Sequence, residues 1–168
     1  MKNKMLIVYY SVSNGNTKQI AEWLQKSVSA DIVQIETVTP YSGSYNDIVN
    51  QGKREVNQGF QPAIKPLSVN PTAYDVIAVG TPTWWYTIAP AVLTFLNSYD
   101  WQGKTIIPFQ THGGWPGHVM KDIKIACKGA VLKYEMEIQF DSTGGSEMVT
   151  PEKNIETWIT QVKEANQE

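Results

Sequence analysis

The residues best suited to chemistry form a polar loop near the start of the chain, residues 11–17. Three hydroxyl groups and two amides surround a single glycine in this loop: Ser11, Ser13, Asn14, Gly15, Asn16 and Thr17. An apolar run precedes the loop and a helical pattern follows it, so the loop joins a strand to a helix N-terminus. Free N–H groups and the positive end of a helix dipole favour an anion there. The spacing predicts a phosphate site, and the alternative is a plain junction with an N-cap.

Two further loops are rich in aromatic residues. Three of the six tryptophans of the chain fall in them: Trp84, Trp85 and Trp115. Wide rings beside a phosphate site indicate a flat heteroaromatic ligand stacked between them, unless they only cover the end of a sheet. In the later loop, Gly113-Gly114 allows a ligand edge to approach the backbone closely, although an ordinary flexible loop has the same composition.

The same loops exclude several phosphate chemistries. No Gly-Lys-Ser/Thr sequence is present, as a nucleoside-triphosphate loop requires. The first loop has no nucleophilic cysteine with an arginine, as a phosphatase needs, and no carboxylates of a phospho-acceptor. His112 and His118 are the only histidines, and no metal site is expected from them. The first loop is therefore expected to hold a phosphate without cleaving it.

Alternating strand and helix patterns must position these loops. The apolar runs 5–10, 74–80 and 105–111 indicate buried strands, 32–36 an edge strand, and 130–138 a last long strand. Helices are expected in the intervals between and after them, near 18–24, 45–57, 90–97, 118–126 and 151–166. This alternation predicts an α/β fold with a parallel sheet and helices on both faces. Ligands of such sheets bind at the carboxyl ends of the strands, where the three loops meet.

Composition limits the function class. The 168 residues carry a formal charge of −2 and 42% hydrophobic residues, so one domain, residues 1–168, is expected with a core of its own. No basic patch indicates nucleic acid binding. The lone Cys127 rules out an internal disulfide and is expected to be buried and inert. With no signal-peptide pattern and no membrane-span pattern, a cytoplasmic protein is expected.

Three motifs in order resemble the flavin loops of flavodoxins. Residues 11–17 are similar to the FMN-phosphate loop Thr/Ser-x-Thr/Ser-Gly-x-Thr. Residues 80–85 look like the second loop in the branch with a Pro-x-Trp-Trp signature, and residues 109–114 are similar to the third loop, Phe-x-Thr-x-Gly-Gly. The match runs from Met5 to the last helix. The resemblance implies a flavodoxin-like three-layer sandwich with a five-stranded parallel sheet in the order 2-1-3-4-5, in its short-chain form.

The resemblance also implies FMN, bound non-covalently by the three loops. The residues that match the cofactor-binding motifs are Ser11, Ser13, Asn14, Gly15, Asn16, Thr17, Pro82, Thr83, Trp84, Trp85, Tyr86, Thr111, His112, Gly113 and Gly114. FMN is expected in preference to FAD because the loop suits a terminal phosphate and Gly-x-Gly-x-x-Gly is absent. The flavin carries the redox chemistry, so no catalytic side chain is expected.

Two main functions stay open, and the electron carrier is favoured over a substrate-specific oxidoreductase. A flavodoxin-like electron-transfer protein would dock on redox partner proteins. An FMN-dependent NAD(P)H/quinone-type reductase would pass electrons to a small acceptor. A fold that has lost its cofactor is a third reading. Either a monomer or a homodimer fits these functions.

One residue departs from the family pattern. The branch usually has glycine after Trp-Trp, where this chain has Tyr86. Glycine there lets a peptide turn toward the flavin through a positive φ, which costs other residues about 1–2 kcal/mol. Tyr86 is therefore expected to disfavour the left-handed conformation and to favour two-electron over one-electron behaviour.

Overall fold

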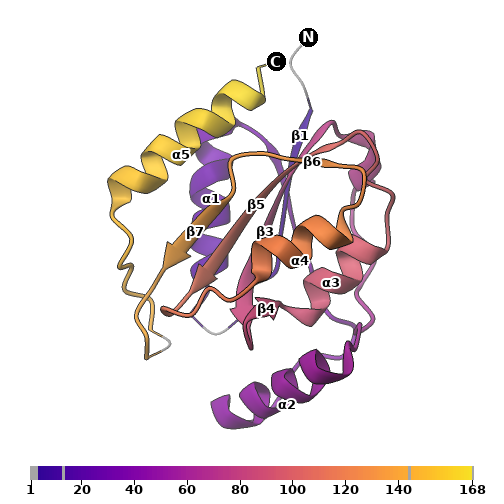
Figure 1. Cartoon of the computed structure of the whole chain (residues 1–168), viewed down its shortest axis with the longest axis vertical. Helices are drawn as coiled ribbons and strands as arrows, with labels where there is room; N and C mark the ends of the chain where they lie inside the picture. The colour runs from indigo at the N-terminus through magenta and orange to yellow at the C-terminus, as the bar shows by residue number, and fades with distance from the viewer. Residues whose placement is uncertain (1–3, 13, 144, 168) are drawn as a thin grey trace.

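A mainly parallel β-sheet forms the middle layer of the protein (Figure 1). The computed structural model describes residues 4–12, 14–143 and 145–167. The described strands are β1 (Met5–Tyr9), β2 (Asp31–Gln34), β3 (Val76–Trp84), β4 (Thr87–Ile88), β5 (Thr105–His112), β6 (Val131–Leu132) and β7 (Met136–Gln139). Their order is β2-β1-β3-β5-β6, with β7 parallel to β5 and β4 antiparallel to β3. This is the expected flavodoxin-like sandwich, and the order 2-1-3-4-5 is confirmed for its five parallel positions.

The sheet has seven described strands instead of five, for two local reasons. β3 runs on through Trp84 and folds back as the short strand β4, so the second loop is a hairpin. The expected last strand, 130–138, is divided into β6 and β7. Tyr134 lies between the two with a φ of 52°, and its carbonyl accepts a hydrogen bond from Trp158 Nε1 at 2.6 Å. A left-handed residue cannot continue a strand, so the ladder is interrupted there.

Helices cover both faces of the sheet, as expected (Figure 1). The described helices are α1 (Asn16–Val28), α2 (Tyr45–Gln58), the 3₁₀ turn η1 (Pro71–Ala73), α3 (Pro90–Asn97), α4 (Val119–Ala126) and α5 (Glu152–Ala165). α1 and α5 pack with one side of the sheet, and α3 and α4 pack with the other.

Alternation along β1 divides the core into these two layers. Ile7 joins the α1–α5 cluster, whereas Leu6 and Val8 join the α3–α4 cluster, and all three are fully buried. Successive strand residues point to opposite faces, so a strand covered on both faces must be apolar throughout. Cys127 also lies in the α3–α4 layer, and burial raises the pKa of its thiol to about 12. The expectation that Cys127 is buried is confirmed.

α2 belongs to neither layer and lies across the carboxyl ends of the strands, at the bottom of Figure 1. It begins with a capping box, in which Asp47 N–H donates to Ser44 Oγ and Ser44 N–H donates to Asp47. These hydrogen bonds hold the pKa of the Asp47 carboxyl below its usual range. The helix ends at Gly59, as expected from the sequence, and Gly59 adopts the left-handed conformation.

Among the described residues, no helix combines the length and the apolar composition that crossing a membrane requires.

Candidate functional site

A cavity of about 330 Å³ opens at the carboxyl ends of β1, β3 and β5. Of the motif residues, the following line it: Asn14, Asn16, Thr17, Pro82, Thr83, Trp84, Trp85, Thr111, His112 and Gly113. The fold thus brings the three loops to one hollow, as expected for a parallel sheet.

The first loop leaves the N-terminus of α1 without a side-chain cap. Gly15 is the N-cap residue, with a φ of 73°, and no acidic residue stands in the first turn. The Lys18 N–H donates to Ser11 Oγ at 3.2 Å, so Ser11 replaces the missing cap from outside the cavity wall. The remaining N–H groups of the first turn have no partner inside the helix and suit an anion. Ser13 lies outside the described residues.

Three threonines tie the loops together. The hydroxyl groups of Thr17 and Thr111 are 2.8 Å apart, and this contact joins residues 94 positions apart in the chain. The Thr83 hydroxyl donates to the Thr111 carbonyl at 3.0 Å and accepts from Gln110 Nε2 at 2.9 Å. Thr17 and Thr111 are both buried, so these hydrogen bonds form a rigid base of the cavity.

Asn16 has one satisfied and one unsatisfied side-chain atom. Its Nδ2 donates to the Gly145 carbonyl at 3.1 Å, which joins the first loop to the loop after β7. Its Oδ1 is buried, and none of the residues that the structure describes gives it a hydrogen bond. A buried acceptor without a donor is costly, so this atom suits a ligand that brings a hydroxyl or N–H group.

Trp84 and Trp85 take different positions. The Trp84 ring contacts Tyr10 and Tyr41 edge-on, with centroids 6.1 and 5.0 Å apart. A Cβ on Gly52 of α2 would lie 3.0 Å from Trp84, so the glycine permits this close packing. Trp84 therefore anchors α2 over the strand ends.

Trp85 is more exposed, at 38% of its surface. Its Nε1 donates to the Val49 carbonyl at 2.9 Å, and Lys53 Nζ lies 5.1 Å from its ring centroid. α2 thus orients the ring that the second loop presents.

Trp85 and Tyr86 form the two-residue turn of the hairpin, with φ angles of 49° and 71°. Tyr86 thus adopts the left-handed conformation that a tyrosine was expected to disfavour. Its carbonyl accepts from the His118 N–H at 2.8 Å, and a Cβ on Gly117 would lie only 2.2 Å from that oxygen. Positive φ at both central positions is the pattern of a type I′ turn, which suits a two-residue hairpin, and these tertiary contacts hold the strained residues there.

His112 lies at the end of β5, and its Nδ1 accepts from the Gly114 N–H at 2.9 Å. Burial lowers the pKa of His112, and the opposing field of Glu137 is the smaller effect. The neutral imidazole therefore carries its proton on Nε2 and can donate a hydrogen bond there. Gly113 approaches the loop after β7, because a Cβ on it would lie 3.4 Å from the Ser142 backbone.

Sequence reasoning missed two segments of the wall. The inner face of α2 contributes Tyr45, Ile48, Val49 and Gly52, and the segment that follows β7 contributes Phe140, Asp141 and Ser142. The second segment could have been predicted from its position after the last strand, because every strand of a parallel sheet ends at the same edge. The sequence contains no comparable pattern that predicts where α2 lies. Of the motif residues, Ser11, Gly15, Tyr86 and Gly114 do not line this cavity.

A model of a known protein family, described as Flavodoxin, matches residues 4–143. A search of the curated proteins finds no match.

Solved structures of flavoproteins are similar over most of the chain. A protein from Bacteroides eggerthii, assigned as a flavoprotein, is 28% identical, with 95% of this chain and 98% of that chain covered and a TM-score of 0.75. A flavoprotein from Lactobacillus acidophilus in complex with FMN is 22% identical, with 80% and 92% covered and a TM-score of 0.67. Oxidised flavodoxin 2 from Bacillus cereus is 18% identical, with 96% of each chain covered and a TM-score of 0.56. The last two likenesses show the fold.

Proposed function

Because the chain belongs to the flavodoxin family, we propose that it is an electron-transfer protein that binds FMN non-covalently at the carboxyl ends of its strands. The observation that carries this proposal is the continuity of the main cavity. One hollow extends from Asn16 and Thr17, at the open N-terminus of α1, to His112 and Gly113 at the end of β5. A phosphate and a flat ring joined by a flexible chain need such a hollow.

The residues present fit the group that the family implies. The N–H groups of the first turn of α1 that Ser11 does not cap, together with the Thr17 hydroxyl, suit the phosphate, because they offer donors and no negative charge. Asn16 Oδ1, which receives no hydrogen bond within the described part of the chain, suits a hydroxyl of the sugar-alcohol chain. When bound, FMN supplies the redox chemistry. The chain's own residues bind it, orient it, and hold the neutral imidazole of His112 beside it.

The test is the identity of the flavin that the protein takes up. Mass spectrometry of the cofactor released from the purified protein is expected to find FMN. Titration of the flavin-free protein should show that FMN binds at least about tenfold more tightly than riboflavin, since charge-assisted hydrogen bonds to the phosphate contribute about 1.5–3 kcal/mol. Recovery of FAD, or no uptake of any flavin, would overturn the proposal.

A reductase remains a second candidate because of one observation. Three exposed rings, Trp85, Tyr86 and Trp115, line a smaller cavity of about 200 Å³ beside the main one. A flat acceptor such as a quinone can stack on rings of this kind. Stopped-flow mixing of the flavin-loaded protein with NAD(P)H distinguishes the two. Bleaching of the flavin by NAD(P)H alone, followed by multiple turnovers with a quinone, would favour the reductase; a flavin that is reduced only through a redox partner protein would favour the carrier.

A further inference from the structure

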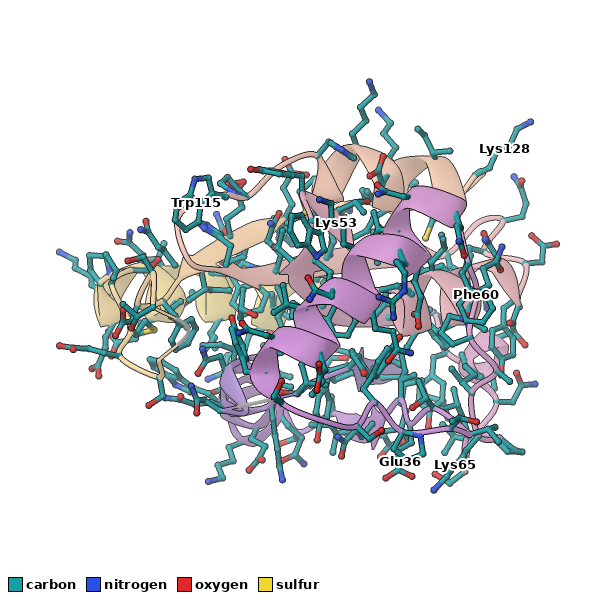
Figure 2. All side chains as sticks on the ribbon, turned by 90° about the horizontal axis from the view of Figure 1, so that it is seen from below. Glu36, Lys53, Phe60, Lys65, Trp115 and Lys128 are labelled. Atoms are coloured by element: carbon teal, nitrogen blue, oxygen red, sulfur yellow. The ribbon has the colours of Figure 1, made fainter. Side chains whose placement is uncertain are left out.

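A second cavity, of about 480 Å³, lies on the other side of the β4 hairpin, between α2, α3 and α4. It shares no lining residue with the main cavity. Much of its wall is apolar. The hairpin and the three helices, with a residue that follows α2, contribute the apolar residues Val56, Phe60, Ile88, Leu93 and Ile125. Phe60 and Ile125 stand exposed, and Figure 2 shows Phe60 near the end of α2, far from Trp115. The volume and the apolar wall are those of a site for a small organic molecule.

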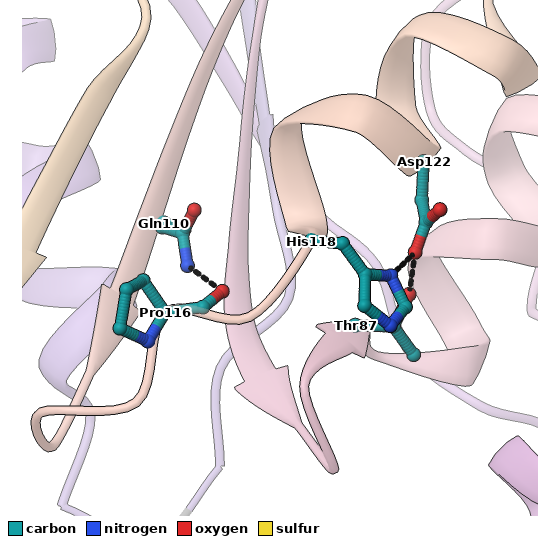
Figure 3. Close-up of polar contacts among 5 residues, drawn as sticks. All are labelled: Thr87, Gln110, Pro116, His118 and Asp122. Atoms are coloured by element: carbon teal, nitrogen blue, oxygen red, sulfur yellow. Dashed lines mark hydrogen bonds and ion pairs between the residues drawn. The ribbon is translucent and has the colours of Figure 1, made fainter.

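One end of this cavity is polar. Asp122 Oδ2 accepts hydrogen bonds from the Thr87 hydroxyl and from the His118 ring, as Figure 3 shows. The other carboxylate oxygen, Oδ1, receives no hydrogen bond from the part of the chain that the structure describes. The two contacts therefore fix the carboxylate in place and leave one of its oxygens for a ligand.

The charge of the wall is one-sided. Glu55 and Asp122 are its acidic residues, and no lysine or arginine is found among the described residues that line it. Glu55 is buried and is hydrogen-bonded to Tyr41 and Gln51, and it forms no ion pair with any described residue. His118 is the remaining titratable group of the wall; it forms an ion pair with Asp122 when protonated, and the wall carries only negative charge when His118 is neutral. Negative charge in a hollow with apolar walls attracts cations and repels anions more strongly than on an open surface.

We propose that this cavity is a second ligand site, for a small apolar molecule that carries a cationic amine. The apolar body lies against Leu93, Ile125 and the other apolar wall residues, and the ammonium group pairs with Asp122. The site goes beyond electron transfer, since none of these residues belongs to the flavin loops. Its existence does not depend on whether FMN binds.

Two probes of the same shape and opposite charge test the proposal. Titration calorimetry compares 4-phenylbutylamine with 4-phenylbutyrate on the purified protein, saturated with FMN where it takes up FMN. The amine is expected to bind roughly tenfold or more tightly than the acid. The ammonium gains an ion pair with Asp122, whereas the carboxylate of the acid is repelled by it. Equal affinity for the two probes, or no binding of the amine, would overturn the proposal.

Nuclear magnetic resonance locates the bound amine. The amine is expected to change the chemical shifts of the backbone amides of Thr87 and Ile125. Shifts at Thr17 and Gly113 instead would place the amine in the main cavity and also count against the proposal. Because the location is read directly, a protein that failed to bind FMN would still give a clear answer about the second site.

Charge variants complete the test. Asp122→Asn should reduce the preference for the amine to near unity, whereas Glu156→Gln removes the same charge from an exposed position on α5 and should leave it unchanged. Ile125→Lys places a cation at an exposed position of the wall and should make the acid the better ligand. An amine preference that survives both Asp122→Asn and Ile125→Lys would rule out this cavity.

Discussion

Single polar side chains connect the site across long sequence separations. Thr17 at the start of α1 meets Thr111 at the end of β5, and Thr83 meets the Thr111 carbonyl. Each contact is one hydrogen bond, and each joins a different pair of loops. The residues that we expect to bind the flavin therefore also hold the loops in register.

Thr17→Val tests the phosphate assignment at this scale. Valine keeps the shape of threonine and removes the hydroxyl, which can donate to a phosphate oxygen while it accepts from Thr111. We expect FMN binding to weaken by about 1.5–3 kcal/mol, as measured by fluorescence titration of the flavin-free protein. Thr160→Val, on the exposed face of α5, is the control. A dissociation constant unchanged in Thr17→Val would contradict the assignment.

His112 should make stability depend on pH. Burial lowers its pKa in the folded protein below the ordinary value of 6.5. As the pH falls, the unfolded chain takes up the proton first. Protonation therefore stabilises the unfolded state relative to the folded state, and the free energy of unfolding decreases below about pH 6.5. Urea unfolding between about pH 7.5 and about pH 5.5 should show a smaller loss for His112→Asn than for the wild type. Equal losses would mean that His112 does not contribute.

At the scale of elements, the β3–β4 hairpin and α2 stabilise each other. Trp84 and Trp85 of the hairpin contact α2, Trp84 at Gly52 and Trp85 at the Val49 carbonyl. α4 holds the hairpin from the other side, through His118 N–H and Asp122. The turn is strained, and these neighbours determine its conformation.

The strain at Tyr86 can be measured by comparing two substitutions. Tyr86→Gly and Tyr86→Ala remove the same exposed ring, but only glycine adopts a φ of 71° without steric cost. We expect Tyr86→Gly to unfold at higher urea concentration than Tyr86→Ala, by about 1 kcal/mol in the free energy of unfolding.

The same pair of substitutions at Tyr45, in the first turn of α2, provides the control. There alanine should be the more stable, because glycine disfavours a helix. Equal stability of the two Tyr86 variants would show that the turn carries no strain.

At the scale of the whole molecule, the main cavity is built from five segments of the chain. Its wall residues lie between Val12 and Ser142 in the sequence. A ligand in it contacts segments that separate when the protein unfolds. Binding and folding must therefore be linked.

FMN is accordingly expected to stabilise the whole protein. At a free concentration of about 100 times its dissociation constant, FMN should raise the free energy of unfolding by about 2.7 kcal/mol, as measured by urea unfolding at fixed FMN concentration. Riboflavin at the same concentration should stabilise the protein less, because it lacks the phosphate. A transition that FMN does not shift would argue against a site in the folded protein.

The sequence by itself determined the order and type of the main elements and the edge at which the three loops meet. Apolar runs and helical spacing are local signals, and parallel strands necessarily end together. α3, predicted at 90–97, is observed over those residues, and α2 ends at Gly59 as expected. The division of the last strand was missed because it depends on a contact with Trp158 in α5.

Only the tertiary structure decided how the site is closed and how its second loop turns. α2 lies over the strand ends because of contacts with Trp84 and Trp85, which no spacing within α2 reveals. Tyr86 is left-handed because His118, far along the chain, holds its carbonyl. The second cavity exists because the β4 hairpin, α2, α3 and α4 meet around it. Each of these features depends on partners distant in sequence, and local propensity contains no information about such partners.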